Sequence, residues 1–263
     1  IIVAAGMVAR LHEVHYNLDA DEIFSVELAS QSFPEVISRS LQDRPHPPLH
    51  NSLLHAWIEV FGTSETSVRA MSVLFSGAFL LTVYGLLRRL LSTWLAVGLV
   101  AILALSPLFV YYGQQARPYA LIAFLSAANL LAFARVLDEP HQRRFVLIWA
   151  VSCVLLLYAQ YLGIMLITLE IGLALFSLRS QRVQILAYGC GAGVLIVPWL
   201  VAAMGNAVST GLDPLNQTSW MEPPTPTDFL WFYVSVFGES PCLRTLSLLA
   251  VLGFLGLAYF ATR

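Results

Sequence analysis

The stretch VRAMSVLFSGAFLLTVYGLLRRLLSTWLAVGLVAILALSPLFVYY, residues 68–112, decides the fold class. It contains two apolar runs, Val68–Leu87 and Trp94–Tyr112, which are separated by the basic pair Arg88-Arg89. A helix that crosses the hydrocarbon core of a bilayer needs about 20 apolar residues, and both runs have this length. The stretch therefore predicts two membrane spans that are joined by a short basic loop.

The whole chain has the same apolar character. Of its 263 residues 58% are hydrophobic and only 11% are charged, and the mean hydropathy is +0.73. An ordinary soluble domain has about 25% charged residues, so this composition excludes a soluble fold. A net charge of −2 also excludes a broadly basic protein that binds nucleic acid. The three cysteines follow no disulfide or metal-ligand spacing.

Further apolar runs predict an all-α, integral, polytopic membrane protein with a single transmembrane domain, residues 1–263. The run 145–178 is too long for one span and predicts two short helices that turn near Tyr158–Gly163. Ile1–Ala9 is too short to span and predicts the end of a first helix that begins earlier. The other expected spans are Pro118–Ala134, Val183–Met204 and Thr245–Thr262.

The arginines predict the orientation of the chain in the membrane. Short loops that carry Arg usually face the cytoplasm. The loops that qualify contain Arg88, Arg89, Arg135, Arg143, Arg144, Arg179, Arg182 and Arg263. The two long segments between them, residues 11–67 and 205–244, hold most of the acidic residues and are therefore expected on the extracytoplasmic side.

The first of these segments, residues 11–67, is too long for a simple connector and is expected to carry function. Apolar residues at helical spacing, such as Ile23, Val26 and Val36, predict short amphipathic helices that lie in the membrane interface. The sequence Pro45-His46-Pro47-Pro48 interrupts this pattern, and a helix is expected to resume over residues 49–61.

Three carboxylates, Asp19, Asp21 and Glu22, stand at the head of this segment. One interpretation is helix capping, because an Asp before an amphipathic helix accepts hydrogen bonds from the first backbone N–H groups. The other is a general base that is held at the membrane surface and faces a lipid-linked substrate. Both interpretations remain open at this point.

Histidines follow the carboxylates at positions 46, 50 and 55. His46 and His50 are four residues apart, a spacing that allows both to bind one divalent metal ion. Catalytic zinc has three protein ligands, however, and a polar role in the interface explains His50 and His55 more simply. No metal ligands are assigned, and a divalent cofactor is left open.

Arg117 lies between two apolar runs, in the sequence Gln114-Gln115-Ala116-Arg117-Pro118-Tyr119. It either extends to the interface or uses its guanidinium to bind a phosphate or a sugar. Glu170 lies inside an expected span, where an acid is costly, and is expected to be remote from the other polar groups.

Four motifs occur in order along the chain. They are Arg10-Leu11 with Asp21-Glu22; His46-Pro47-Pro48-Leu49 with His55-Ala56-Trp57, Phe61-Gly62, Ser64-Glu65 and Arg69; Ser106-Pro107 with residues 114–119; and residues 157–163. Taken together, these motifs resemble the membrane glycosyltransferases of the GT-C fold.

The resemblance covers residues 10–199 and is nearest to family 39, the branch of the protein O-mannosyltransferases and the lipid A aminoarabinose transferase. Members usually have Glu at the position of Gln115 and often His at that of Gln160. Members are also longer, so we expect an N-terminal fragment.

The resemblance implies an inverting transfer from a polyprenyl-phosphate-linked sugar to an acceptor hydroxyl on a glycan, a lipid or a protein of the cell envelope. By position, Asp21 is the candidate catalytic base, and Glu22 is expected to bind the acceptor or to orient Asp21. Arg117 and His46 are expected to hold the phosphate of the leaving group. Asp19 and Tyr119 are further candidate substrate-binding residues.

Two other classes of function fit a polytopic protein with an acidic outer loop. A transporter or lipid flippase usually places its polar groups near the middle of the membrane, on broken helices. A non-catalytic assembly subunit would keep the shape of a GT-C enzyme without its chemistry. The polar clusters of this sequence gather at one membrane surface, which favours an enzyme of the interface.

Overall fold

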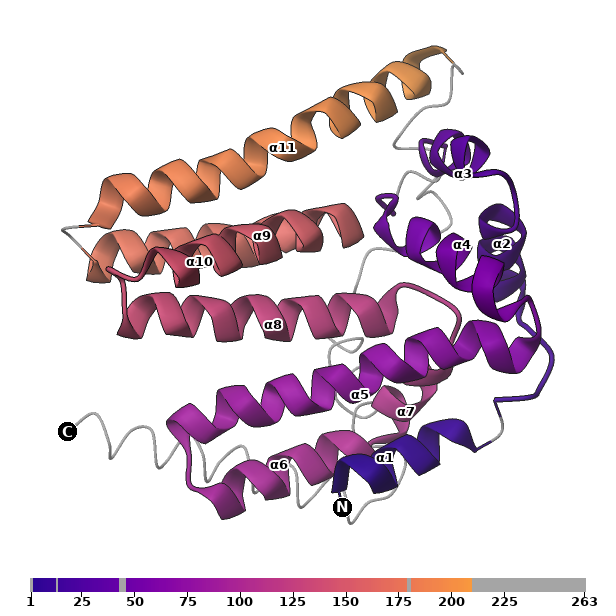
Figure 1. Cartoon of the computed structure of the whole chain (residues 1–263), viewed down its shortest axis with the longest axis horizontal. Helices are drawn as coiled ribbons and strands as arrows, with labels where there is room; N and C mark the ends of the chain where they lie inside the picture. The colour runs from indigo at the N-terminus through magenta and orange to yellow at the C-terminus, as the bar shows by residue number, and fades with distance from the viewer. Residues whose placement is uncertain (1, 13, 43–45, 179–180, 210–263) are drawn as a thin grey trace, which may run out of the picture.

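The computed structural model describes residues 2–12, 14–42, 46–178 and 181–209. Every regular element in these ranges is an α-helix (Figure 1), which confirms the predicted all-α class. The helices are α1 Ile2–Leu11, α2 Ala20–Ala29, α3 Phe33–Ser40, α4 Leu49–Phe61, α5 Glu65–Leu90, α6 Thr93–Leu105, α7 Pro107–Gln114, α8 Tyr119–Asp138, α9 Arg143–Ala159, α10 Gly163–Ser177 and α11 Arg182–Ser209.

The long apolar helices form a bundle in which α5 packs on α8, α8 on α9 and α9 on α11 (Figure 1). Among the described residues, three helices are long and apolar enough to cross a membrane: α5, α8 and α11. The predicted spans Val68–Leu87 and Val183–Met204 fall within α5 and α11, and Pro118–Ala134 corresponds to α8, which begins one residue later at Tyr119. The predicted turn near Tyr158–Gly163 is also present, between α9 and α10.

The run Trp94–Tyr112 is not the single straight span that its length predicts. It is divided at Ser106 into α6 and α7, whose axes are bent by 60°. Pro107 starts α7, where its missing N–H costs no helical hydrogen bond, but it cannot continue the ladder of α6. Counted as one broken span, this pair raises the number of candidate spans to four.

Other boundaries also differ from the prediction. Helix α11 continues past Gly205, where the second outer segment was expected to begin, and ends at Ser209. The rest of that segment, residues 210–244, and the expected span Thr245–Thr262 lie outside the described residues. At 15 residues, α10 extends only ~22 Å at about 1.5 Å per residue, less than the ~30 Å of a bilayer core.

Close packing of the bundle uses both large and small side chains. Trp149, which is fully buried, lies at the centre of the cluster between α8, α9 and α11, with its ring centroid 5.8 Å from that of Phe133. Gly6 lets α1 approach α6, because a Cβ atom there would lie 2.9 Å from that of Ala104. Small residues of this kind allow helix backbones to come close in a membrane, where dispersion contacts drive association.

Helices α2, α3 and α4 lie across one end of the bundle (Figure 1), and their presence confirms the predicted short helices of the first outer segment. They are held together partly by the Nδ1 atom of His55, which lies 2.9 Å from the carbonyl oxygen of Ala29. Phe24 and Phe33 remain 48% and 51% exposed, which leaves apolar surface for contact with a membrane interface.

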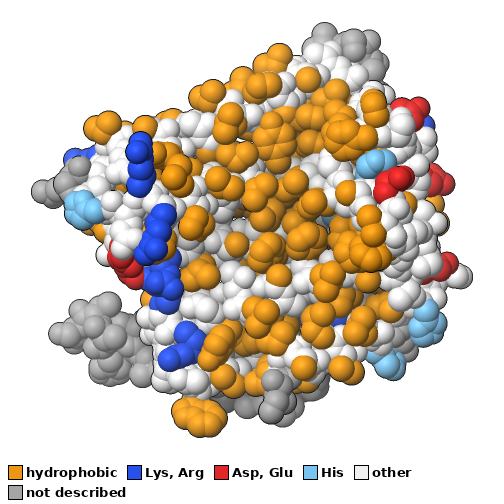
Figure 2. All heavy atoms as spheres, viewed as in Figure 1, with side chains coloured by type: hydrophobic (Ala, Val, Ile, Leu, Met, Phe, Trp, Pro, Cys, Tyr) orange, Lys and Arg blue, Asp and Glu red, His pale blue; other side chains and the backbone are white. Residues whose placement is uncertain are grey.

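Charges are separated along the bundle (Figure 2). On the face shown, arginines gather at one end, while most acidic residues and histidines lie at the opposite end, with hydrophobic side chains between them. The arginine-rich loops and the acidic first segment therefore lie at opposite ends of the bundle.

Glu170 has polar neighbours inside the bundle, which its position in the sequence did not reveal. It is 3% exposed, and the indole Nε1 of Trp149 donates a hydrogen bond of 2.8 Å to its carboxylate. With its amide nitrogen facing Glu170, Asn129 lies 2.9 Å from both carboxylate oxygens and accepts a hydrogen bond from Ser152. The helices α8, α9 and α10 therefore share a buried polar cluster.

We predict that Trp149→Phe destabilises the protein, because it leaves a buried acceptor of Glu170 without its indole donor. A buried polar group that loses its partner costs about 1–3 kcal/mol. The thermal unfolding midpoint in detergent should fall relative to the wild type. Trp94→Phe is the matched control, since Trp94 is 85% exposed, and its midpoint should not change. Equal midpoints for the two variants would refute a stabilising role for the indole contact.

Candidate active site

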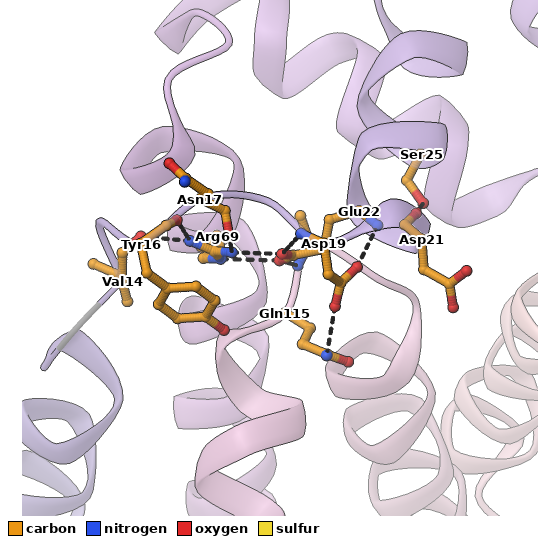
Figure 3. A network of polar contacts seen from close by, with 10 residues as sticks. Val14, Tyr16, Asn17, Asp19, Asp21, Glu22, Ser25, Arg69 and Gln115 are labelled. Carbon is orange, nitrogen blue, oxygen red and sulfur yellow. Dashed lines mark hydrogen bonds and ion pairs between the residues drawn. The ribbon is translucent and has the colours of Figure 1, made fainter.

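The polar end of the bundle is organised by Arg69, which projects from the first turns of α5 toward the start of α2 (Figure 3). Its Nε and Nη2 atoms donate to the two carboxylate oxygens of Glu22 at 2.9 and 2.5 Å. Both side chains are 0% exposed. A two-pronged pair of this kind fixes the orientation as well as the distance of the carboxylate.

The same guanidinium also shapes the chain between α1 and α2. It donates to the backbone carbonyls of Val14, Tyr16 and Asn17, at distances of 2.9, 2.5 and 3.2 Å. Its central carbon lies 3.7 Å from the centroid of the Tyr16 ring. Burial raises the pKa of Tyr16, and the positive charge of Arg69 opposes this rise.

Glu22 has further partners besides Arg69. Its Oε1 atom accepts a hydrogen bond of 2.8 Å from the backbone N–H of Ala116, in the segment that joins α7 and α8. Its Oε2 atom accepts one of 3.1 Å from the N–H of Asp19. Glu22 thus holds three separate segments of the chain together, and its carboxylate faces protein on every side.

Asp19 caps helix α2, which confirms the capping interpretation for this carboxylate. Its Oδ1 atom accepts a hydrogen bond of 2.8 Å from the N–H of Glu22, and the two residues form a reciprocal capping box. Its Oδ2 atom accepts one of 3.2 Å from Nε2 of Gln115. Gln115, which stands where the resembling family usually has Glu, therefore contacts the acidic cluster directly (Figure 3).

Asp21 lies beside this network but outside it. Its side chain is 72% exposed and forms a loose ion pair with Arg117, whose Nη2 atom lies 3.8 Å from Oδ2. Figure 3 shows the Asp21 carboxylate pointing away from Glu22 and Arg69. An exposed carboxylate next to a fixed one is available to accept a proton from a substrate.

Arg117 is held at the start of α8 with its side chain only 10% exposed. Its Nη1 atom donates to the hydroxyl of Ser25 at 3.0 Å and to the backbone oxygen of Asp21 at 3.4 Å. Within the described part of the chain, its buried Nε atom has no hydrogen-bond partner. Its central carbon lies 6.0 Å from the ring centroid of Tyr119.

Tyr119 and His46 are the two remaining candidate substrate-binding residues. Tyr119 begins α8 and meets the Tyr112 ring edge-on, with centroids 4.8 Å apart. His46 is half-buried and precedes Pro47 and Pro48, which are both buried ahead of α4. The structure thus brings Asp19, Asp21, Glu22, Arg117 and Tyr119 into one connected region.

The histidines in the described part of the chain belong to no cluster of three or more potential metal ligands. No group of three or more His, Cys, Asp or Glu side chains there is arranged to hold a metal ion. His50 is 2% exposed and its Nδ1 atom lies 3.4 Å from Oδ1 of Asn51 within α4.

Arg69 is the site residue whose role the sequence alone did not supply. A signal was present, since Arg69 falls at the start of the apolar run Val68–Leu87, and a charge in such a run usually has a specific partner. The identity of that partner required the fold, because Glu22 is 47 residues away in the chain.

A polar site at one end of a bundle of apolar, membrane-length helices defines a membrane-embedded protein. The sequence model of the dolichyl-phosphate-mannose-protein mannosyltransferase family matches residues 45–202, and the chain belongs to this family. At the family level it is a glycosyltransferase of the GT-C type. No curated protein and no solved structure matches the chain significantly. The matched range includes Arg69 and Arg117 and begins after Asp21.

We predict that Glu22→Gln strongly destabilises the polar end of the bundle, because it leaves the buried charge of Arg69 without its counter-ion. Breaking a buried ion pair by removing one partner costs about 3–5 kcal/mol. The unfolding midpoint in detergent and the protease resistance of residues 14–22 should both fall.

Glu27→Gln is the control for this prediction, since Glu27 lies on the exposed side of the same helix. It removes the same charge and should leave both readouts unchanged. A Glu22→Gln protein as stable as the control would show that the buried pair does not hold the site together.

Proposed function

We propose that the chain is an inverting glycosyltransferase of the cell membrane that moves a sugar from a polyprenyl-phosphate donor to an acceptor hydroxyl on the extracytoplasmic side. Asp21 serves as the catalytic base. The observation that carries this proposal is the difference in exposure between two adjacent carboxylates. Glu22 is fully buried, whereas Asp21 is 72% exposed and lies beside Arg117.

In the proposed reaction the acceptor oxygen attacks the anomeric carbon of the donor sugar. The carboxylate of Asp21 takes the proton of the acceptor hydroxyl as the new C–O bond forms. The bond between the anomeric carbon and the phosphate oxygen breaks, and its electron pair leaves with the polyprenyl phosphate. One displacement inverts the anomeric configuration, and general-base help is worth roughly 10²- to 10⁴-fold in rate.

Arg117 is proposed to stabilise the negative charge that develops on the leaving phosphate. Its guanidinium is positioned by Ser25, and its distance of 3.8 Å from Asp21 leaves the two groups only loosely paired. Preorganised donors aimed at a developing charge are often the largest contribution to catalysis. His46 and Tyr119 remain proposed substrate-binding residues at the edge of this region.

Glu22 and Asp19 support the site through their positions. Asp19 caps α2 and Glu22 binds Arg69, and together they fix the helix turn that presents Asp21. We propose a glycan, a lipid or a protein of the cell envelope as the acceptor, and the bilayer-exposed apolar helices as the surface along which the polyprenyl chain lies.

We predict that Asp21→Asn lowers sugar transfer by about 10²- to 10⁴-fold without changing the stability of the protein, because the side chain is 72% exposed and only loosely paired with Arg117. The measurement follows label leaving a panel of polyprenyl-phosphate sugars in membranes that carry the protein. Asp138→Asn is the control, since Asp138 is a 57% exposed acid that pairs with Arg89 elsewhere on the bundle. Full activity of Asp21→Asn would exclude Asp21 as the base.

We predict that Arg117→Gln lowers kcat by about 10²- to 10³-fold, the usual effect of removing one group that stabilises transition-state charge. Arg135→Gln removes an exposed guanidinium from the other end of α8 and should leave kcat unchanged. If Arg117→Gln raised only the KM for the acceptor, the guanidinium would be assigned to acceptor binding instead.

A further inference from the structure

Arg10, near the end of α1, is a second fully buried arginine, and its donors go to backbone carbonyls and one hydroxyl. Its Nε atom donates to the Ser76 hydroxyl at 2.5 Å. Its Nη1 atom donates to the carbonyls of Gly6 and Ala104 at 2.9 and 2.8 Å, and Nη2 donates to that of Phe109 at 3.2 Å.

Two of these acceptors stand on opposite sides of the break at Ser106. Ala104 belongs to the last turn of α6, and Phe109 belongs to the first turns of α7. The last carbonyls of a helix have no partner within the helix, and Pro107 has no N–H to offer. The buried guanidinium of Arg10 supplies the missing donors. Its positive charge is also stabilised by the negative, C-terminal end of the α6 dipole.

The far end of α7 is tied to the same part of α1. The side-chain Nε2 atom of Gln114, the last residue of α7, donates to the backbone carbonyls of Arg10 and His12 at 2.9 and 2.7 Å. The next three residues are those that reach the proposed active site: Gln115 contacts Asp19, Ala116 contacts Glu22, and Arg117 lies beside Asp21.

There is no spare room between Arg10 and α7. A Cβ atom at Gly113 would lie 2.7 Å from the Ser76 hydroxyl and 2.9 Å from Nε of Arg10. The guanidinium therefore packs directly against the backbone of α7, and any larger residue at position 113 must displace it or the helix.

We propose that Arg10 is a positioning residue that sets the bend between α6 and α7 and so holds residues 115–117 against the acidic turn of residues 19–22. It touches no substrate and acts through α7. The inference rests on the proposed function for its effect on transfer, whereas the bend itself is a property of the fold.

The first test compares two Gly→Ala variants in the same broken span. Gly113→Ala places a methyl group against Arg10, whereas Gly98→Ala in α6 places one in open space. A displacement of about 1 Å at a reacting centre can cost about 10²-fold in rate. Gly113→Ala should lower kcat for sugar transfer by roughly this factor with little change in the donor KM, and Gly98→Ala should not.

The second test measures the bend without using activity. Spin labels at exposed positions 95 and 111, on α6 and α7, report the distance across the break in a protein whose native cysteines are replaced by Ser. Arg10→Gln should broaden and shift this distance distribution, Arg10→Lys should do so less, and Gly98→Ala should leave it unchanged.

The two measurements separate the possible failures. An unchanged distance distribution in both Arg10→Gln and Gly113→Ala overturns the proposal, as do equal kcat values for Gly113→Ala and Gly98→Ala. If Arg10→Gln does not fold, the Gly113→Ala distances decide alone. If the distances shift but wild-type protein transfers no sugar from any donor, the bend is confirmed and the proposed function fails.

Discussion

The buried ion pair between Glu22 and Arg69 is the interaction on which the polar end of this helix bundle depends. A charge inside a low-dielectric bundle is tolerated only when it is paired and its remaining donors and acceptors are satisfied. Here those partners come from the turn before α2, from α5 and from the link between α7 and α8. The need to satisfy one pair of charges therefore brings three distant segments to one place.

This requirement also explains how two adjacent carboxylates acquire different environments. Successive residues on a helix point about 100° apart at 3.6 residues per turn, so the turn that buries Glu22 directs Asp21 outward. The reciprocal cap between Asp19 and Glu22 fixes the start of that turn. Asp21 is thus presented by a rigid scaffold while its own carboxylate stays 72% exposed, which is what a base that must meet a substrate requires.

Buried polar groups inside the bundle must also find partners within the protein. Lipid offers no hydrogen-bond partners, so each polar group in a span must be satisfied by protein. Arg10 meets this need with the carbonyls around the break at Ser106, and Glu170 meets it with Trp149 and Asn129. The few polar side chains inside the apolar bundle therefore have specific hydrogen-bond partners. One of them, Arg10, is proposed to set the bend between α6 and α7 on which the site depends.

The sequence by itself determined the membrane class, the long helices α5, α8 and α11 and the short helices between residues 20 and 61. All of these follow from composition and from spacing within a few turns of helix, where interactions are local. Only the tertiary structure decided that Glu22 pairs with Arg69, 47 residues away, and that Asp21 and Arg117 meet. It also decided that Trp94–Tyr112 breaks at Ser106 and that Glu170 has polar neighbours. Local patterns carry no information on which distant carbonyl or carboxylate satisfies a buried charge, because that choice depends on how the whole bundle packs.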